Sequence, residues 1–225
     1  MNHRTSLQGI DVSHWAGKIN FRRVKNSGVR IVYIKSTQGT DYVDPDFERN
    51  YRDARREDLC IGFYHYVTAR NTSDAIEEAR FFVSRIRDKV HHARAAMDFE
   101  SFGDLSTTQV REISLRFLDT LERELRYRPV LYSDASNAST RFADHRLTDY
   151  PLWIADYDVR RPDMENPWSA WSGWQYTDQG RIRGISGDVD RDRFRKEILI
   201  DDGRGCDLRV HDVEDREQSQ TVNID

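Results

Sequence analysis

Short runs of apolar, β-branched and aromatic residues recur along the chain and predict eight strands. Between the earlier runs, apolar positions change to a spacing of three and four residues, which is typical of amphipathic helices. Strands that alternate with helices indicate an α/β fold. The predicted strands span residues 8–13, 29–37, 60–67, 94–100, 129–134, 151–157, 171–178 and 187–194.

Three helices are predicted in the first half of the chain. One spans residues 46–58, and capping patterns precede the other two, at Asn71 to Ser73 and at Ser106 with Gln109. We expect the apolar stripes of these two helices to pack against the sheet. Their members are Ile76, Ala79, Val83, Ile86 and Val90 in one helix, and Val110, Ile113, Phe117, Leu121 and Leu125 in the other.

The connections in the second half of the chain differ from these. Pro162 and Pro167 interrupt any helix between residues 158 and 170, and residues 179–186 are too few for a parallel crossover. The pattern therefore predicts a barrel that begins with regular β/α units and ends with strands that lack proper helices.

Composition and charge narrow the possible partners. The 225 residues include 10 Phe, 10 Tyr and 5 Trp, which is enough for a sizeable core, and the net charge is −4. Residues 201–225 carry eight acidic and three basic side chains, a net of −5, so residues 1–200 sum to +1. No broad basic field is available for nucleic acid. We predict a barrel over residues 1–200 and an acidic polar tail over residues 201–225, either disordered or a local extension.

The two cysteines provide no disulfide framework. Cys60 opens an apolar run and is predicted to be a buried thiol, whereas Cys206 lies in the acidic tail. A disulfide between them is the minor alternative, because the sequence alone defines no geometry. No run approaches the ~20 apolar residues of a membrane span, and residues 1–8 lack the apolar region of a secretory signal. We expect either another route of release or a signal that this chain does not contain.

Acidic residues recur near the ends of the predicted strands. In β/α barrels the active site forms at the C-terminal ends of the strands, so these carboxylates are predicted to converge on one cleft. They are Asp11, Asp98, Glu100, Asp156, Asp188 and Asp190.

The Asp98-Phe99-Glu100 triplet is the sharpest local signal. Alternation along a strand places both acids on one face, and two residues of strand span about 6.6 Å. Repulsion between close carboxylates raises one pKa, so one member can act as a general acid while its ionised partner stabilises positive charge. The triplet alone also fits solvated acids at an ordinary strand end.

Seven short motifs, in order between residues 8 and 195, resemble glycoside hydrolase family 25. Each is weak alone, but seven in the family's order are specific. They are Gly9–Ser13 (GIDVS), Tyr33–Lys35 (YIK), Gly62–Tyr66 (GFYHY), Met97–Glu100 (MDFE), Leu152–Ala155 (LWIA), Trp174–Thr177 (WQYT) and Gly184–Asp190 (GISGDVD).

The resemblance implies a modified TIM-like barrel of five β/α units followed by three strands, in agreement with the connection lengths. It also implies a lysozyme (N-acetylmuramidase) that hydrolyses the β-1,4 bond between N-acetylmuramic acid and N-acetylglucosamine in peptidoglycan. By motif, Glu100 resembles the general acid and Asp98 its partner carboxylate. Asp11 and Asp190 resemble the flanking acids; alternation alone does not separate Asp190 from Asp188, and the family's VD motif selects Asp190.

Five further residues are predicted to bind substrate: Lys35, Tyr64, Tyr132, Trp153 and Trp174. Lys35 would hydrogen-bond or counter the acids, Tyr64 would reach a sugar or its N-acetyl group, and the other three rings would stack on sugar faces. The equal alternatives are a surface lysine and rings that pack in the core. His65 is predicted to be a packed structural histidine.

Two positions depart from the family pattern. Gln38 follows the second strand where Glu is common, which leaves the rate and the pH optimum open. Asp192 stands where Asn is common, and we expect that change to be peripheral.

Both mechanisms compatible with the motifs retain the anomeric configuration. Asp98 is either the direct nucleophile or the group that orients the substrate's own N-acetyl oxygen, and the motif weakly favours the second. Rival functions are a non-catalytic wall-glycan-binding barrel, a chitinase-like glycosidase and a metal-dependent phosphodiesterase, which would need histidines among the acids. We expect no cofactor or metal, peptidoglycan glycan strands as the partner, a monomer, and an extracellular or cell-wall site of action.

Overall fold

Strands form where the β-branched and aromatic runs occur, because such side chains suit a pleated surface buried on both faces. The computed structural model describes residues 6–208. All eight predicted strands are present, with ends that differ by a few residues; the short β3 was not predicted. The strands are β1 (Leu7–Val12), β2 (Ile31–Gln38), β3 (Tyr42–Val43), β4 (Cys60–Tyr66), β5 (Ala96–Asp98), β6 (Val130–Asp134), β7 (Leu152–Ala155), β8 (Gly173–Gly180) and β9 (Val189–Phe194).

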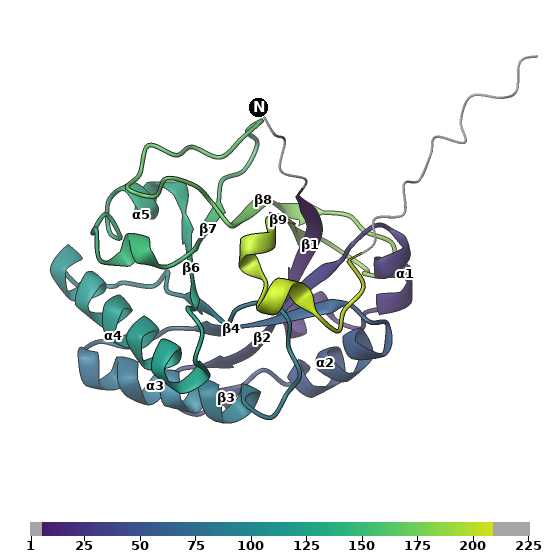
Figure 1. Cartoon of the computed structure of the whole chain (residues 1–225), viewed down its shortest axis with the longest axis horizontal. Coiled ribbons are helices and arrows are strands. Elements are labelled where there is room, and N and C mark those ends of the chain that lie inside the picture. The colour runs from purple at the N-terminus through teal and green to yellow at the C-terminus, as the bar shows by residue number, and fades with distance from the viewer. Residues whose placement is uncertain (1–5, 209–225) are drawn as a thin grey trace, which may run out of the picture.

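The strand pairing closes a barrel (Figure 1). Neighbours run parallel from β1 through β2, β4, β5, β6 and β7 to β8. Strand β9 lies antiparallel between β8 and β1, as the short connection at residues 179–186 requires. Strand β3 forms a hairpin with the end of β2.

Each of the first five parallel strands is followed by an α-helix, and β7, β8 and β9 are not, so the predicted architecture is confirmed. The α-helices are α1 (Phe21–Asn26), α2 (Phe47–Arg56), α3 (Thr72–Ile86), α4 (Thr107–Leu125) and α5 (Ala135–Ser139). Single-turn 3-10 helices are η1 (His14–Ala16), η2 (Leu147–Asp149), η3 (Lys196–Ile198) and η4 (Asp201–Gly203).

The longer helices begin at the predicted caps. The Asn71 side chain accepts hydrogen bonds from two backbone N–H groups at the start of α3, and Ser106 with Gln109 forms a capping box on α4. The placement of Val90 in the α3 stripe is wrong: α3 ends at Ile86, and Val90 is 49% exposed. Residues 87–90 instead turn the chain back towards β5.

The interior of the barrel is filled by large aromatic rings. Trp153 contacts Tyr33 and Phe194, with ring centroids 4.6 Å and 5.3 Å away. Glycine makes room for them: a Cβ at Gly62 would lie 2.5 Å from the Tyr33 ring. The barrel is therefore a packed core rather than a pore.

A second core closes the barrel at the N-terminal ends of its strands. The residues after β9 cross this end, as the yellow ribbon in Figure 1 shows, and Ile198 and Leu199 pack with Leu7, Ile31 and Cys60. The functional site is therefore expected at the opposite end, where the strands have their C-terminal ends. Within residues 6–208, no helix combines the length and apolar character that crossing a membrane requires.

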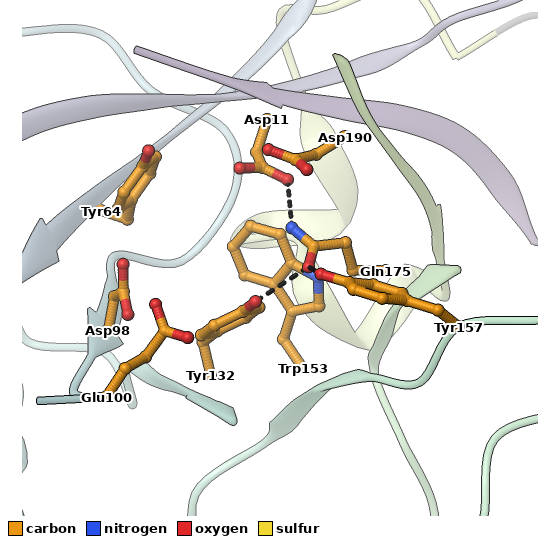
Figure 2. Close-up of a pocket in the computed structure, with 9 residues that line it drawn as sticks. All are labelled: Asp11, Tyr64, Asp98, Glu100, Tyr132, Trp153, Tyr157, Gln175 and Asp190. Atoms are coloured by element: carbon orange, nitrogen blue, oxygen red, sulfur yellow. Dashed lines mark hydrogen bonds between the residues drawn. The ribbon is translucent and has the colours of Figure 1, made fainter. Parts of the chain in front are cut away.

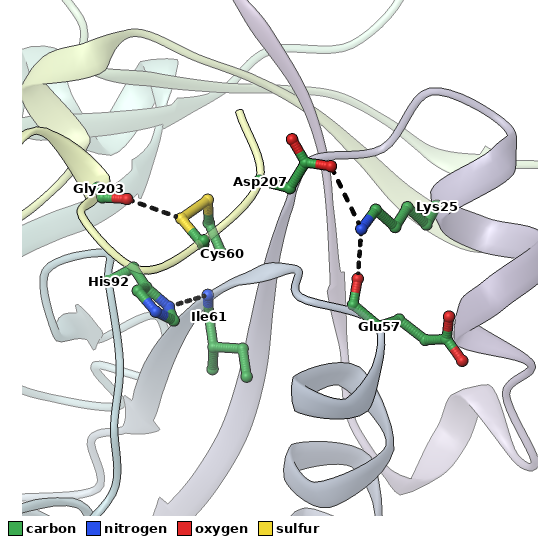
Figure 3. Close-up of a disulfide and its surroundings, with 8 residues drawn as sticks. Lys25, Glu57, Cys60, Ile61, His92, Gly203 and Asp207 are labelled. Carbon is green, nitrogen blue, oxygen red and sulfur yellow. Dashed lines mark hydrogen bonds and ion pairs between the residues drawn. A yellow bond between two sulfur atoms is a disulfide. The ribbon is translucent and has the colours of Figure 1, made fainter. Parts of the chain in front are cut away.

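Cys60 and Cys206 form a disulfide (Figure 3), so the prediction that Cys60 is a buried thiol is wrong. The two residues are 146 positions apart, and only the packing of residues 196–208 under the barrel brings them together. An ion pair supports the attachment, because the Lys25 ammonium bonds the Glu57 carbonyl at 2.7 Å and lies 3.5 Å from Asp207. The rest of the predicted acidic tail, from residue 209, lies outside the described residues.

Cys206→Ser is expected to lower the free energy of unfolding by about 2–4 kcal/mol, because the disulfide restricts the unfolded chain over a long loop. Guanidinium unfolding of the oxidised wild type and the variant measures this difference. Dithiothreitol is expected to destabilise the wild type and to leave the variant unchanged. Equal stability of the two oxidised proteins would show that the bond contributes nothing.

Candidate active site

Inward-facing side chains at the C-terminal ends of the barrel strands enclose a pocket of about 250 Å³ (Figure 2). Each strand positions its residue by alternation, with one side chain facing the barrel axis and the next facing the helices. The lining residues are Asp11, Tyr64, Asp98, Glu100, Tyr132, Trp153, Tyr157, Gln175 and Asp190. Among residues 6–208, no group of three or more histidine, cysteine or acidic side chains is placed to hold a metal ion.

All four predicted catalytic acids line this pocket. Asp98 and Glu100 lie side by side on one wall, and Asp11 and Asp190 lie together across from them (Figure 2). Asp11 is the cross-strand partner of Asp190 in the antiparallel β1–β9 pair. Asp188, which alternation alone could not exclude, is half-exposed and pairs with Arg181 at 2.9 Å.

Asp98 and Glu100 occupy different environments. Asp98 ends β5 and is 7% exposed, whereas Glu100 lies beyond the strand and is exposed. Burial raises the pKa of Asp98 well above its ordinary value, and repulsion from and hydrogen bonding with the Glu100 carboxyl raise it further. The positive charge of Lys35 opposes this shift. The carboxyl whose pKa is raised is thus Asp98, whereas the motif assigns the role of proton donor to Glu100.

Lys35 lies beside the carboxyl pair rather than in the pocket lining. Its ammonium donates to the side-chain oxygen of Gln38 at 3.0 Å and lies 4.9 Å from the centre of the Tyr66 ring. Burial lowers the pKa of Lys35, and the charges of Asp98, Asp44 and Glu100 oppose that change. Gln38 therefore positions Lys35, although the family commonly has a charged residue there.

A hydrogen-bond network centred on Gln175 supports the opposite wall. The Gln175 amide donates to Asp11 at 2.7 Å, and its oxygen accepts from the hydroxyls of Tyr132 at 2.8 Å and Tyr157 at 2.6 Å. Neither Gln175 nor Tyr157 is among the site residues predicted from the sequence. Gln175 belongs to the WQYT motif, but periodicity alone does not reveal which face of β8 is internal, and the register of β8 shifts after Gln175.

Trp174 lies outside the pocket, contrary to the prediction that it binds sugar. It precedes Gln175 on β8 and so faces the outer layer of the barrel, where its indole donates to the Asp156 carbonyl at 2.9 Å. Tyr64, Tyr132 and Trp153 do line the pocket. Trp153 is only 2% exposed and forms its floor rather than a stacking surface.

His65 is a structural residue, as predicted. It is fully buried, and its two ring nitrogens contact the Thr37 hydroxyl at 2.7 Å and the Glu78 carboxylate at 3.1 Å.

Asp192 is not peripheral, and that expectation is wrong. Two residues after Asp190 on β9, it also faces the barrel interior, and it is fully buried. One carboxyl oxygen accepts from the Trp153 indole at 3.0 Å, while the other has no hydrogen-bond partner. Strand alternation brings this acid directly beneath the pocket.

Crowding and burial raise the pKa values of the three acids on β1 and β9. Burial raises that of Asp11 most, followed by the charges of Asp190 and Asp192. Burial also raises the pKa of Asp190 to about 6, against a hydrogen bond with Asp11 that lowers it. For Asp192, burial and the charge of Asp190 raise the pKa, while the Trp153 hydrogen bond lowers it. Burial and mutual repulsion thus favour the protonated forms of these carboxyls.

A closed β/α barrel with a carboxyl pair and buried aromatic rings at the C-terminal ends of its strands has the site of a glycoside hydrolase. The family model described as "Glycosyl hydrolases family 25" matches residues 10–185. The chain belongs to this family and is a glycoside hydrolase.

Similar proteins cover most of the chain. "Uncharacterized protein YegX" of Escherichia coli K12 is 35% identical over 84% of this chain and 70% of its own. "Lysozyme M1" of Streptomyces globisporus is 34% identical over 84% of this chain and 68% of its own. The solved structure of a bacterial lysozyme from Streptomyces coelicolor has a TM-score of 0.75 at 32% identity, and the match covers 84% of this chain and 92% of that one.

Asp192→Asn is expected to stabilise the protein at neutral pH. A carboxyl whose pKa is raised in the folded state favours folding at low pH, and this advantage is lost as pH rises above the unfolded value near 4. The amide carries no charge and can donate towards Asp11, so we expect a gain of about 1–3 kcal/mol at pH 7. Urea unfolding at pH 4 and pH 7 measures the change.

The matched control is Asp188→Asn, because Asp188 lies on the same segment but is exposed. Its stability should follow that of the wild type at both pH values. A gain from Asp192→Asn that is equal at pH 4 and pH 7 would rule out protonation as the cause.

Proposed function

We propose that this protein is a lysozyme that hydrolyses the β-1,4 bond between N-acetylmuramic acid and N-acetylglucosamine in peptidoglycan. The Asp98–Glu100 pair, at the wall of a pocket in a family 25 barrel, is the observation that carries this proposal. The lysozymes among the similar proteins support glycan strands as the substrate and the cell wall as the place of action. We expect the active form to be a monomer.

Glu100 donates a proton to the leaving glycosidic oxygen. In the free protein, burial and the neighbouring Glu100 carboxyl raise the pKa of Asp98. A sugar bound in the pocket covers the exposed Glu100 and brings the leaving oxygen to its carboxyl. Lys35 then stabilises the ionised form of Asp98. Substrate binding thereby brings the leaving oxygen to its proton donor, Glu100, beside the stabilising carboxylate of Asp98.

The substrate's own N-acetyl oxygen attacks the anomeric carbon, and ionised Asp98 orients the amide and stabilises its developing positive charge. The product keeps its anomeric configuration, because two successive displacements occur at the same carbon. Asp98 as a direct nucleophile gives the same configuration and is the competing route. Asp11 and Asp190 complete the negative field that stabilises the oxocarbenium-like transition state.

Intact acids weigh against a barrel that binds wall glycans without cleaving them, because both members of the pair are present and face the pocket. A chitinase-like specificity uses the same chemistry and differs only in the sugar whose bond is broken. The reducing ends of the products separate these alternatives.

Glu100→Gln is expected to lower kcat on purified peptidoglycan by about 10²–10⁴-fold, because the amide cannot donate the proton that the leaving group needs. Turbidity loss measures the rate, and the released fragments are analysed for muramic acid reducing ends. The variant should still co-sediment with the wall.

The matched control is Glu77→Gln, which changes an exposed glutamate on α3 outside the pocket. It should clear peptidoglycan at the wild-type rate. Co-sedimentation without clearing by the wild type would indicate a binding protein, and glucosamine reducing ends would indicate a chitinase-like specificity.

Removal of the N-acetyl group from muramic acid is expected to slow cleavage by about 10²-fold or more, since the attacking oxygen is then missing. The control substrate lacks the acetyl group on glucosamine instead, and its cleavage should change far less. Turnover of the first substrate, together with a glycosyl ester on Asp98 found by mass spectrometry, would establish Asp98 as the nucleophile.

A further inference from the structure

Three rings project at the end of the barrel where the pocket lies. Trp15 is 86% exposed, far more than the other exposed large hydrophobic side chains among the described residues, and Tyr42 is 38% exposed. The His14 ring lies between them, with centroids 4.4 Å from Trp15 and 6.5 Å from Tyr42. Removing an indole from water is strongly favourable, because its apolar surface is large. An exposed tryptophan within a cluster of rings therefore indicates a ligand that covers it.

The segment that carries Trp15 is fixed to the barrel. The buried Asp44 carboxylate accepts from the His14 backbone N–H at 3.1 Å and contacts the His14 ring nitrogen at 2.8 Å. Ser13 caps η1 by accepting from the Trp15 N–H, and Arg49 donates to the Gly17 carbonyl at 2.7 Å. The exposed indole therefore stands on an anchored backbone, which lowers the entropy cost of binding.

The cluster continues from the Lys35 side of the pocket. Trp15 follows Asp11 by four positions, just past the end of β1, and Tyr42 is the β3 partner of Gln38, which holds Lys35. The Asp44 backbone N–H donates to the carbonyl of Ser36 at 3.0 Å, so the anchor of the cluster lies next to the residue that follows Lys35 on β2. The rings thus extend the wall of the pocket where β1 and β2 end.

We propose that Trp15, His14 and Tyr42 form a distal sugar-binding platform for the glycan strand whose scissile bond lies in the pocket. This inference rests on the proposed function. A polymeric substrate extends beyond a pocket of about 250 Å³, so further sugars lie against the adjoining surface. Flat aromatic faces suit the C–H faces of N-acetylated pyranose rings, and the imidazole can hydrogen-bond a hydroxyl or amide.

The test compares long and short glycans in the inactive Glu100→Gln background, so that binding is measured without turnover. Adding Trp15→Ala should raise the Kd for peptide-free glycan strands by about 3–10-fold, which is the typical effect of losing one aromatic contact. The Kd for a peptidoglycan disaccharide, whose two sugars flank the scissile bond, should stay within error, because it is too short to reach the platform. In the active protein, Trp15→Ala should raise KM on long strands and leave kcat unchanged.

Trp15→Tyr keeps a ring and should recover most of the affinity, whereas Val90→Ala alters an exposed apolar residue in the turn after α3 and should have no effect. An unchanged Kd for long strands, or equal weakening for long and short glycans, would overturn the platform. If the wild-type protein cleaves no glycan at all, the proposed function is wrong. If the wild type cleaves glycans but Trp15→Ala has no effect that depends on glycan length, only the platform is wrong.

Discussion

The antiparallel insertion of β9 between β8 and β1 is the constraint on which the site depends. It closes the barrel, and its register places Asp190 directly opposite Asp11. The same alternation places Asp192 one step deeper, beneath the pocket. Parallel strands alone could not complete the ring with so short a connection, because a parallel crossover requires about a dozen residues. The absence of a helix between β8 and β9 and the placement of Asp190 opposite Asp11 thus have one structural cause.

Closure brings several carboxyls into a small, largely buried volume. Asp11, Asp98 and Asp192 are each at least nine-tenths buried, and burial raises their pKa values. Such a site is unfavourable for folding, because ionised carboxyls lose solvation and repel one another when they are buried together. Gln175 and Lys35 moderate the repulsion from opposite walls.

One end of the barrel stabilises the fold, and the other end carries the candidate active site. The N-terminal end is covered by apolar residues after β9 and is held by the Cys60–Cys206 bond. The C-terminal end carries the pocket and the exposed rings near β1 and β2, where a substrate can reach them.

The sequence by itself determined the strand runs, the capped helices, the order of the motifs and the acids at the strand ends, because these depend on periodicity and local chemistry. It did not determine which face of β8 is internal, so Trp174 was chosen in place of Gln175. It also did not reveal the burial of Asp192 or the pairing of Cys60 with Cys206. These features depend on contacts between segments far apart in the chain, and only the closed barrel brings those segments together.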